Sequence, residues 1–391
     1  MIACYAWTNL QILNVTNARV NVYGEKKADL YVRVGRHISR ELIAAVRASG
    51  VYENVYTLDP VEISYAHTKF GKVPRLRVLF LRDAYLKAYN ALLDHTAPDR
   101  KYERVLMAWF FADNAYVINY FAQHTDHLAI TLVDEGTGSY CYGKKELFFP
   151  GFMASGRWQN RIRRWLTEGF LAKRLSKNID TICLYRPEYC QPDIDYKKVV
   201  LPQIKEDTNP VIHNLLCASA GSLDATQFIR YNKRRYYYFS LFSQEGKSFD
   251  LVSINILDSV LKSSFNKQVV AKIHTGNTAH AENFAKSYED RIYVDRNVYI
   301  FEALYAQLDD PSDKVLVSCA STATLNPKFM FGQEPYVIFT YRLYNTYRQV
   351  GVERDDWIAN ALKDAYEDKS KVMIPNSMQE LKDMIRNIHH Q

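Results

Sequence analysis

The chain alternates between short, nearly continuous apolar runs and longer segments in which apolar residues recur every three or four positions. Short apolar runs are typical of parallel strands buried on both faces, and the longer pattern is typical of amphipathic helices. In the first half, the expected strands are residues 2–7, 28–34, 54–58, 104–111, 128–133 and 181–185. The helices expected between them begin near Leu10 and cover residues 39–48, 81–93 and 114–123. This succession predicts a doubly wound α/β domain.

The same alternation starts again after residue 233. The expected strands are residues 236–242, 268–273, 291–294, 315–317 and 336–339. The expected helices are residues 249–261, 282–288 and 298–308, with another from about Ala323 and two amphipathic helices within residues 357–389. Residues 187–233 contain four prolines and predict a connection between two domains.

We therefore expect an α/β protein of two doubly wound, Rossmann-like domains. The first covers residues 1–233, with the connection at 187–233, and the second covers residues 234–345. Residues 346–391 form a helical tail. The length of 391 residues agrees with two domains, because a single core rarely grows so large.

Composition and charge narrow the class of partner. The formal net charge of +7 favours anionic partners such as phosphates, nucleotide-sugars or anionic lipid surfaces. No nucleic-acid-binding motif accompanies this charge, so we expect no nucleic-acid partner. The six cysteines lack a Cys-x-x-Cys pair, and no apolar run approaches the ~20 residues that span a bilayer. These features predict a cytoplasmic protein with reduced thiols.

One basic segment breaks the alternation of strands and helices. From Arg157 to Lys177 the chain combines two tryptophans with a dense basic face. Helices of this kind lie on anionic membrane surfaces or bind anionic acceptors, which would place the protein at the inner face of the membrane. The alternative is a surface helix whose tryptophans pack inward. The segment could also face a second subunit, so a homodimer stays open.

Four polar loops follow predicted strands, where open α/β sheets place their chemistry. They are Asp134-Glu135-Gly136, Ser243-Gln244-Glu245, His274-Thr275-Gly276 and the loop from Ser318 to Thr322. We expect one active site built from these loops.

The residue types in these loops suit transfer of a sugar from a nucleotide. Glu245 is our first choice for the general base. His274 could donate a hydrogen bond or proton to a phosphate leaving group, although a lone histidine is often a core residue. Ser318, Gly276, Ser321 and Thr322 could cradle the donor phosphate, although Ser321 and Thr322 are also ordinary helix caps. Glu302 could bind the nucleotide ribose or be a surface glutamate.

We expect no metal site and no cofactor. No set of His, Cys, Asp and Glu has a recognisable ligand spacing. Asp193-Ile194-Asp195 matches the Asp-x-Asp pattern of metal-dependent glycosyltransferases, but it lies in a proline-flanked loop. We interpret it as a chance match.

Two doubly wound domains with a helical tail are the architecture of the GT-B glycosyltransferases, whose domains face a cleft. Short motifs in this chain resemble the bacterial lipooligosaccharide sialyltransferases (glycosyltransferase family 52) and the related bacterial polysialyltransferases. The matching pieces are Thr8-Asn9-Leu10-Gln11, Asp134-Glu135-Gly136, Ser243-Gln244-Glu245, His274 and Ser321-Thr322. Two positions depart from the family pattern, because Gln244 and Thr275 stand where those enzymes have proline.

The resemblance implies an inverting, metal-independent sialyltransferase with CMP-sialic acid as its donor substrate. The acceptor would be a bacterial surface glycan or glycolipid, such as lipooligosaccharide or capsule. In the polysialyltransferase branch the acid of the Asp/Glu-Gly motif is the base, which makes Glu135 the alternative to Glu245. The resemblance places the following residues on the acceptor side: Thr8, Gln11, Asp134 and Gly136.

Two alternatives remain open. The same fold could use another nonulosonic acid or a nucleotide hexose as donor. A non-catalytic protein that binds glycans or nucleotides during assembly could also have kept the fold.

Overall fold

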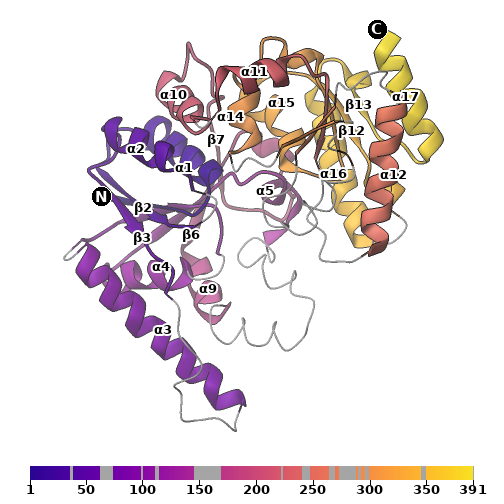
Figure 1. The fold of residues 1–391 in the computed structure, drawn as a ribbon. Coiled ribbons are helices and arrows are strands. Elements are labelled where there is room, and N and C mark those ends of the chain that lie inside the picture. The colour runs from indigo at the N-terminus through magenta and orange to yellow at the C-terminus, as the bar shows by residue number, and fades with distance from the viewer. Residues whose placement is uncertain are drawn as a thin grey trace. The chain divides into compact units, whose positions relative to one another are not determined.

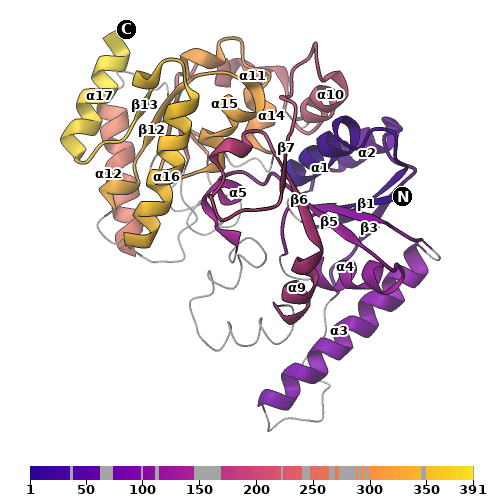
Figure 2. The same ribbon diagram turned by 180° about the vertical axis from the view of Figure 1, so that it is seen from behind.

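The structure is a computed structural model, and the chain is divided into two compact units, Met1–Pro202 and Gln203–Gln391. It describes residues 1–35, 38–61, 74–97, 100–110, 114–144, 169–221, 223–239, 247–263, 269–272, 288, 292–295, 299–344 and 349–390. The division at Pro202 and Gln203 lies inside the segment predicted as the connection between two domains. Each unit contains its own parallel sheet (Figures 1 and 2).

The first unit contains a seven-stranded sheet in the order β3-β2-β1-β4-β5-β6-β7. Every described strand pair in it is parallel. Its strands are β1 (Ile2–Ala6), β2 (Ala28–Arg33), β3 (Asn54–Leu58), β4 (Arg104–Met107), β5 (Ala129–Val133), β6 (Ile179–Leu184) and β7 (Lys197–Val200). All five residues of β1 are buried, as a central strand covered on both faces requires.

Helices cover both faces of this sheet. Figures 1 and 2 show α1 and α2 over one face and α3, α4 and α9 over the other. Their bounds are α1 (Asn9–Asn21), α2 (Arg40–Ala48), α3 (Pro74–Thr96), α4 (Asn114–Gln123), α5 (Thr137–Cys141) and α9 (Phe170–Leu175). Ser39 caps α2 as predicted, because its hydroxyl accepts a hydrogen bond from the amide of Leu42 at 3.1 Å.

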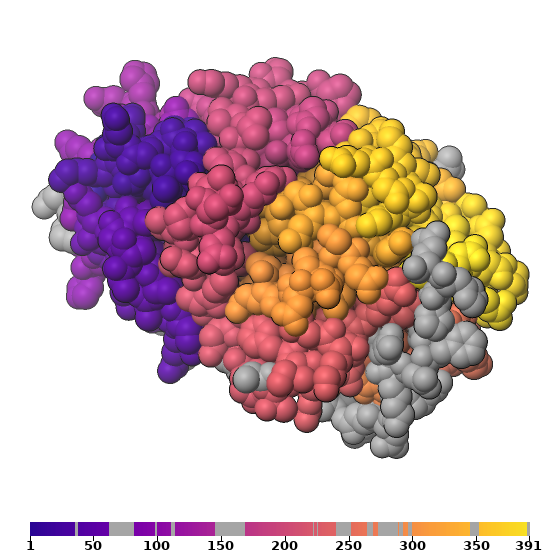
Figure 3. All heavy atoms as spheres, turned by 90° about the horizontal axis from the view of Figure 1, so that it is seen from above, coloured from indigo at the N-terminus to yellow at the C-terminus, as the bar shows by residue number. Residues whose placement is uncertain are grey.

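The second unit contains a six-stranded parallel sheet in the order β10-β9-β8-β11-β12-β13. Its strands are β8 (Tyr236–Phe239), β9 (Val269–Lys272), β10 (Tyr293–Asp295), β11 (Val315–Ser318), β12 (Tyr336–Phe339) and β13 (Val372–Met373). Its helices are α10 (Pro210–Ala218), α11 (Ala225–Asn232), α12 (Lys247–Ser263), α14 (Phe301–Tyr305), α15 (Asn326–Phe331), α16 (Gln349–Ala365) and α17 (Met378–His390). Figure 3 shows the last residues of the chain, in yellow, at the surface of this unit.

Tyrosine dominates the largest fully buried side chains, which explains much of the aromatic content. In β8, for example, Tyr236, Tyr237 and Tyr238 are each 1% exposed. The Tyr237 hydroxyl donates to the carbonyl of Tyr231 at 2.8 Å, which satisfies a polar group inside the core.

The structure corrects several sequence predictions. The helix expected at 298–308 is the shorter α14, the strand expected at 104–111 ends at Met107, and a 3₁₀ turn at Thr322–Thr324 precedes α15. Two edge strands, β7 and β13, were not predicted. β7 is the sequence Lys-Lys-Val-Val with most residues exposed, and β13 has two residues, so neither has the apolar run of a buried strand. None of the described helices combines the length and apolar character of a membrane-crossing helix.

Candidate active site

In the first unit, the sheet topology gathers polar and aromatic residues at one edge. β1 lies between β2 and β4, so the strand order reverses there, and doubly wound sheets bind ligands outside the carboxyl ends at this point. β1 leads into Trp7 and Thr8, β4 leads toward Trp109, and β5 leads into Asp134. The structure therefore brings together the two predicted acceptor-side motifs, at positions 8–11 and 134–136.

Thr8 and Gln11 shape the turn from β1 into α1. The Thr8 hydroxyl caps the helix by accepting from the amide of Gln11 at 3.1 Å. The Gln11 side chain reaches back, and its Oε1 accepts from the amide of Trp7 at 2.9 Å. Gln11 is 1% exposed, so its amide group is fixed inside the turn.

Asp134 is buried, and hydrogen-bond donors surround its carboxylate. Oδ1 accepts from the amide of Gly136 at 2.8 Å, and Oδ2 accepts from the hydroxyl of Tyr140 and the amide of Tyr185. Its backbone carbonyl accepts from Asn14 of α1 at 2.8 Å. Burial raises the pKa of Asp134 to about 6, although these donors oppose the shift. The carboxylate therefore holds the loop in place. Gly136 follows with φ of 94°, a conformation that favours glycine.

Glu135 is in a different environment from Asp134. Its amide donates to the hydroxyl of Ser139 at 2.9 Å, which fixes the backbone. Its Oε2 is enclosed and has no hydrogen-bond partner among the described residues. Burial raises the pKa of Glu135 to about 8, the Gln11 side chain lowers it, and the charge of Asp134 raises it. An enclosed carboxyl of raised pKa at a strand end is a candidate general base.

Trp109 was not among the predicted site residues. Its backbone carbonyl accepts from Asn114 Nδ2 at 2.7 Å, and its ring packs on Gly138 of α5. A Cβ at position 138 would lie 2.4 Å from two carbons of that ring, so the contact requires glycine. The signal that could have found Trp109 is its place just beyond a buried strand at the reversal of strand order. It was hidden because the apolar run continues through it to Phe111.

In the second unit, the loop after β11 contains three predicted phosphate-binding residues. The Ser318 hydroxyl accepts from the amide of Ser321 at 3.0 Å, and the Ser321 hydroxyl accepts from the amide of Ala323 at 3.3 Å. Ser321 thus caps the 3₁₀ turn that begins at Thr322. The hydroxyls of Ser318 and Ser321 therefore already bind backbone amides, and their role toward a phosphate stays a prediction.

Glu302 is buried rather than on the surface, at 5% exposure in α14. Its Oε1 accepts from Asn326 Nδ2 at 2.5 Å. Burial raises the pKa of Glu302, against the opposing effects of that hydrogen bond and of Lys272. This excludes the surface alternative and leaves ribose binding as a prediction.

Several predicted residues lie outside the described part of the chain. They are Glu245, His274, Gly276 and residues 157–168 of the basic segment. The described end of that segment exposes Lys173, Arg174 and Lys177, beside Phe170 at 53% exposure. Membrane contact there stays a prediction.

The Asp-x-Asp match has a structural role. Asp193 Oδ2 accepts from the amide of Lys144 at 2.9 Å, and Asp195 pairs with Lys144 Nζ at 2.5 Å. Both acids thus tie down the loop after α5. Within the described ranges, no cluster of three or more His, Cys, Asp and Glu residues could hold a metal ion.

These features define an α/β protein of two doubly wound units with the GT-B fold. No family model matches the chain, and no curated protein matches it in sequence. Among solved structures, it is similar to the UDP-GlcNAc 2-epimerase from Methanocaldococcus jannaschii, with a TM-score of 0.53 and 10% identity over 100% of this chain and 93% of that one. LpCGTa in complex with UDP gives a TM-score of 0.48 and 12% identity, over 100% of this chain and 90% of that one. At 10% identity, the similarity to the epimerase indicates a shared fold and nothing about function. The similarity to LpCGTa is too remote to support any further conclusion.

Proposed function

We propose that this protein is a GT-B glycosyltransferase that moves a sugar from a nucleotide donor to a hydroxyl group, with Glu135 as general base. The main observation that supports this proposal concerns Oε2 of Glu135, which is enclosed and has no hydrogen-bond partner among the described residues. Glu135 lies at the carboxyl edge of the first sheet. Buried polar atoms in proteins nearly always have a partner, so an unsatisfied one at such an edge suits a ligand group. The fold is compatible with the same class of donor, because one solved structure with this fold is named as a UDP-GlcNAc 2-epimerase.

The reaction needs one proton acceptor and one leaving group. The acceptor oxygen attacks the anomeric carbon while the bond from that carbon to the phosphate oxygen breaks and its electron pair leaves with the nucleotide. Glu135 takes the proton of the attacking hydroxyl. General base catalysis of this kind contributes about 10²–10⁴-fold to the rate.

The raised pKa of Glu135 suits this role and sets its pH dependence. A carboxylate with a pKa of about 8 binds a proton more strongly than an exposed glutamate. The same shift leaves the free enzyme mostly protonated below pH 8. Since the base must be ionised, kcat/KM should rise with pH and level off above about 8.

CMP-sialic acid is our proposed donor, and a bacterial surface glycan is our proposed acceptor. The support is the motif resemblance, two pieces of which, at positions 8–11 and 134–136, lie together in the structure through the contact of Asn14 with Asp134. The specific alternative is epimerisation of a nucleotide hexose, because one solved structure with the same fold is named as a UDP-GlcNAc 2-epimerase.

Turnover with defined donors separates these functions. The protein is incubated with CMP-sialic acid or UDP-GlcNAc, with and without a galactose-terminated glycan, and the nucleotide and sugar products are followed. We expect CMP release and a sialylated glycan, and at least a hundredfold loss in Glu135→Gln. Conversion of UDP-GlcNAc to an epimer without an acceptor would instead assign the alternative. Near-normal turnover by Glu135→Gln would return the role of base to Glu245.

A further inference from the structure

Two aromatic rings meet over Gly138 in α5. A Cβ added at position 138 would lie 2.4 Å from two carbons of the Trp109 ring and 3.1 Å from Cε2 of Tyr142. The centroids of the two rings are 6.0 Å apart, and their planes are inclined by 53°. Both side chains are partly exposed. Trp109 and Tyr142, the aromatic pair, therefore form an angled apolar surface that is partly open.

The backbone on both sides of the aromatic pair is held in place. The carbonyl of Trp109 accepts from Asn114 Nδ2 at 2.7 Å. Two residues after Tyr142, the amide of Lys144 donates to Asp193 Oδ2 at 2.9 Å. A surface that is already ordered loses little conformational freedom when a ligand binds to it.

The aromatic pair lies beside the proposed base. Gly138, under the two rings, follows Glu135 by three residues, and the hydroxyl of the next residue, Ser139, accepts from the amide of Glu135 at 2.9 Å. A hydroxyl that reaches Glu135 belongs to a larger acceptor molecule. The surface next to Glu135 must therefore contact the rest of that molecule.

We propose that the aromatic pair binds the acceptor sugar through its apolar face, and that this sugar is a galactoside. The inference rests on the proposed function, to which it adds the surface that selects the acceptor. A pyranose has hydroxyls at its rim and C–H groups on its faces, so one face can pack on aromatic rings. In galactose the axial O4 leaves the hydrogens of C3, C4 and C5 on one face, whereas glucose has the C4 hydrogen on the other.

A nucleotide base is the other ligand that aromatic side chains commonly stack on. A planar base packs best on one ring or between parallel rings, whereas two rings inclined by 53° suit the puckered chair of a sugar. The carboxyl of Asp134, in the loop that leads into α5, has a pKa of about 6 and is ionised at neutral pH. Its negative charge disfavours the phosphate of a nucleotide and leaves a neutral sugar unaffected.

Saturation-transfer NMR measures this contact without relying on turnover. Wild type is mixed with methyl β-lactoside in the presence of CMP, the aromatic protons are saturated, and the sugar protons that receive saturation are identified. Methyl β-cellobioside, which ends in glucose, is the matched ligand.

Four variants complete the test. Tyr142→Leu and Trp109→Leu each remove one ring, and Tyr142→Phe keeps the ring. Tyr336→Leu is the control, because Tyr336 is a partly exposed tyrosine at the amino end of β12 and doubly wound sheets bind ligands at the carboxyl ends. Circular dichroism and Tm check that each variant folds.

We expect the strongest saturation at H3, H4 and H5 of galactose. Wild type with the cellobioside, and each leucine variant of the aromatic pair with the lactoside, should bind about tenfold more weakly. Such a loss corresponds to ~1.4 kcal/mol, or to roughly 50 Å² of apolar contact. Tyr142→Phe and Tyr336→Leu should stay within twofold of wild type.

Unchanged lactoside binding in folded Tyr142→Leu would overturn the inference, and this variant decides the matter if Trp109→Leu does not fold. Equal losses in Tyr142→Leu and Tyr142→Phe would also overturn it, because the hydroxyl and not the ring would then bind the sugar. A parallel assay of CMP release from CMP-sialic acid separates the two proposals. Lactoside bound as described without any transfer would refute the proposed function alone, whereas transfer to lactoside without saturation of its galactose would refute the aromatic site alone.

Discussion

At the residue scale, adjacent acids after β5 have opposite environments. Asp134 accepts hydrogen bonds from Gly136, Tyr140 and Tyr185, whereas Oε2 of Glu135 accepts none from the described residues. Successive residues at a strand end point in different directions, so one acid can fix the loop while its neighbour stays available. An ionised carboxylate that is enclosed without a hydrogen-bond partner destabilises the fold. The environment of Glu135 can therefore be tested by measuring the stability of the protein.

Glu135→Gln should change stability in a pH-dependent way. The folded pKa of about 8 lies above the model value of 4.5, so the stability linked to this group is complete below pH 4.5 and is lost as the pH rises through 8. The neutral variant escapes this loss. We expect little difference from wild type at pH 4.5, and a more stable variant at pH 9, by up to ~5 kcal/mol at about 1.4 kcal/mol per pKa unit.

Urea denaturation at the two pH values measures this difference, with the exposed Glu188→Gln as control. A variant that is equally stable relative to wild type at pH 4.5 and pH 9 would show that Glu135 is not held in its neutral form.

The sequence could identify the acids but not their environments. The family resemblance assigned positions 8–11 and 134–136 to the acceptor side, and in the structure Asn14, in the helix that follows Thr8, donates to the carbonyl of Asp134. The sequence could not show that Asp134 is saturated with donors or that the Gln11 amide is fixed by Trp7, because both depend on residues distant in the chain or on side-chain rotation. Whether Glu245 and His274 join this site stays a prediction.

At the scale of elements, the contact between α5 and the end of β4 shapes the candidate site. Gly138 lies against the Trp109 ring, and an added Cβ would be 2.4 Å from it. We expect Gly138→Ala to shift Trp109 or α5, to destabilise the protein by about 1–3 kcal/mol and to lower turnover.

Gly35→Ala is the matched control, because nothing lies within 4 Å of its added Cβ. Tm and kcat/KM are measured for both variants. If Gly138→Ala behaved like Gly35→Ala in both measurements, the tight packing of α5 on Trp109 would be refuted.

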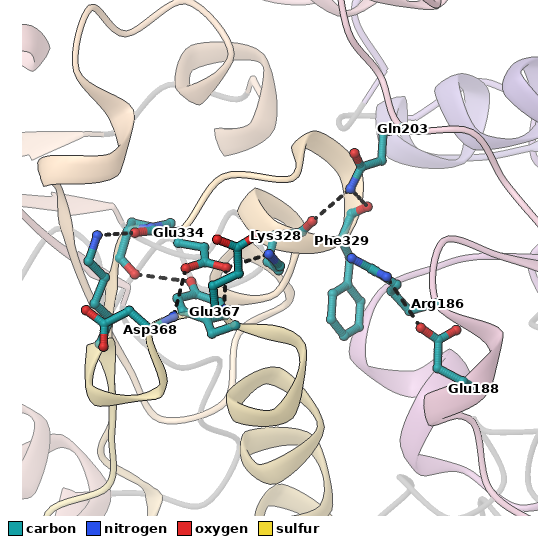
Figure 4. Close-up of polar contacts among 11 residues, drawn as sticks. Arg186, Glu188, Gln203, Lys328, Phe329, Glu334, Glu367 and Asp368 are labelled. Atoms are coloured by element: carbon teal, nitrogen blue, oxygen red, sulfur yellow. Dashed lines mark hydrogen bonds and ion pairs between the residues drawn. The ribbon is translucent and has the colours of Figure 1, made fainter.

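A second element-scale contact holds the unpredicted strand β13 on its sheet. Glu334 pairs with the buried Lys328, and accepts from the amides of Glu367 at 2.8 Å and Asp368 at 3.3 Å in the turn before β13 (Figure 4). These contacts compensate for the short β-ladder, which pairs two residues of β13 with β12. A strand fixed by a distant side chain has no local sequence signal, which explains why the sequence analysis missed it.

Glu334→Ala should loosen this attachment. It leaves the ammonium group of Lys328, whose side chain is 8% exposed, without its carboxylate partner, and it removes the acceptor for two amides. We expect a loss of about 3–5 kcal/mol, as when one partner of a buried ion pair is removed. Hydrogen exchange should also accelerate at residues 367–373. Glu367→Ala keeps the backbone amide and should match wild type; equal exchange in the two variants would contradict the role of Glu334.

At the scale of the whole molecule, the protein is two units with separate sheets and separate cores. The sequence predicted this architecture because each half repeats the strand-helix alternation. It predicted the central strands best, since burial on both faces imposes a continuous apolar run, as in Ile2–Ala6. The edge strands, such as Lys197–Val200, face solvent and have no such requirement.

Two separate cores predict that unfolding proceeds in two cooperative steps, each assignable by a substitution confined to one unit. In the first unit, Asp134→Asn places an amide donor against groups that donate to the carboxylate, and should destabilise by about 1–3 kcal/mol. In the second unit, Gly332 has φ of 77°, and a Cβ there would lie 2.9 Å from Gln203 Oε1. Gly332→Ala should destabilise by about 1–2 kcal/mol.

Differential scanning calorimetry should therefore show two transitions. Asp134→Asn should lower the midpoint temperature of one, and Gly332→Ala should lower that of the other. A shift of about 2–4 °C per kcal/mol is expected for units of this size. If the donor nucleotide binds the second unit, saturating CMP should raise the midpoint temperature of one transition only, the one that Gly332→Ala lowers. The reason is that a ligand stabilises only the unit that binds it. A single transition that both substitutions lower equally would show instead that the units unfold together, and the effect of CMP would then report on the whole chain.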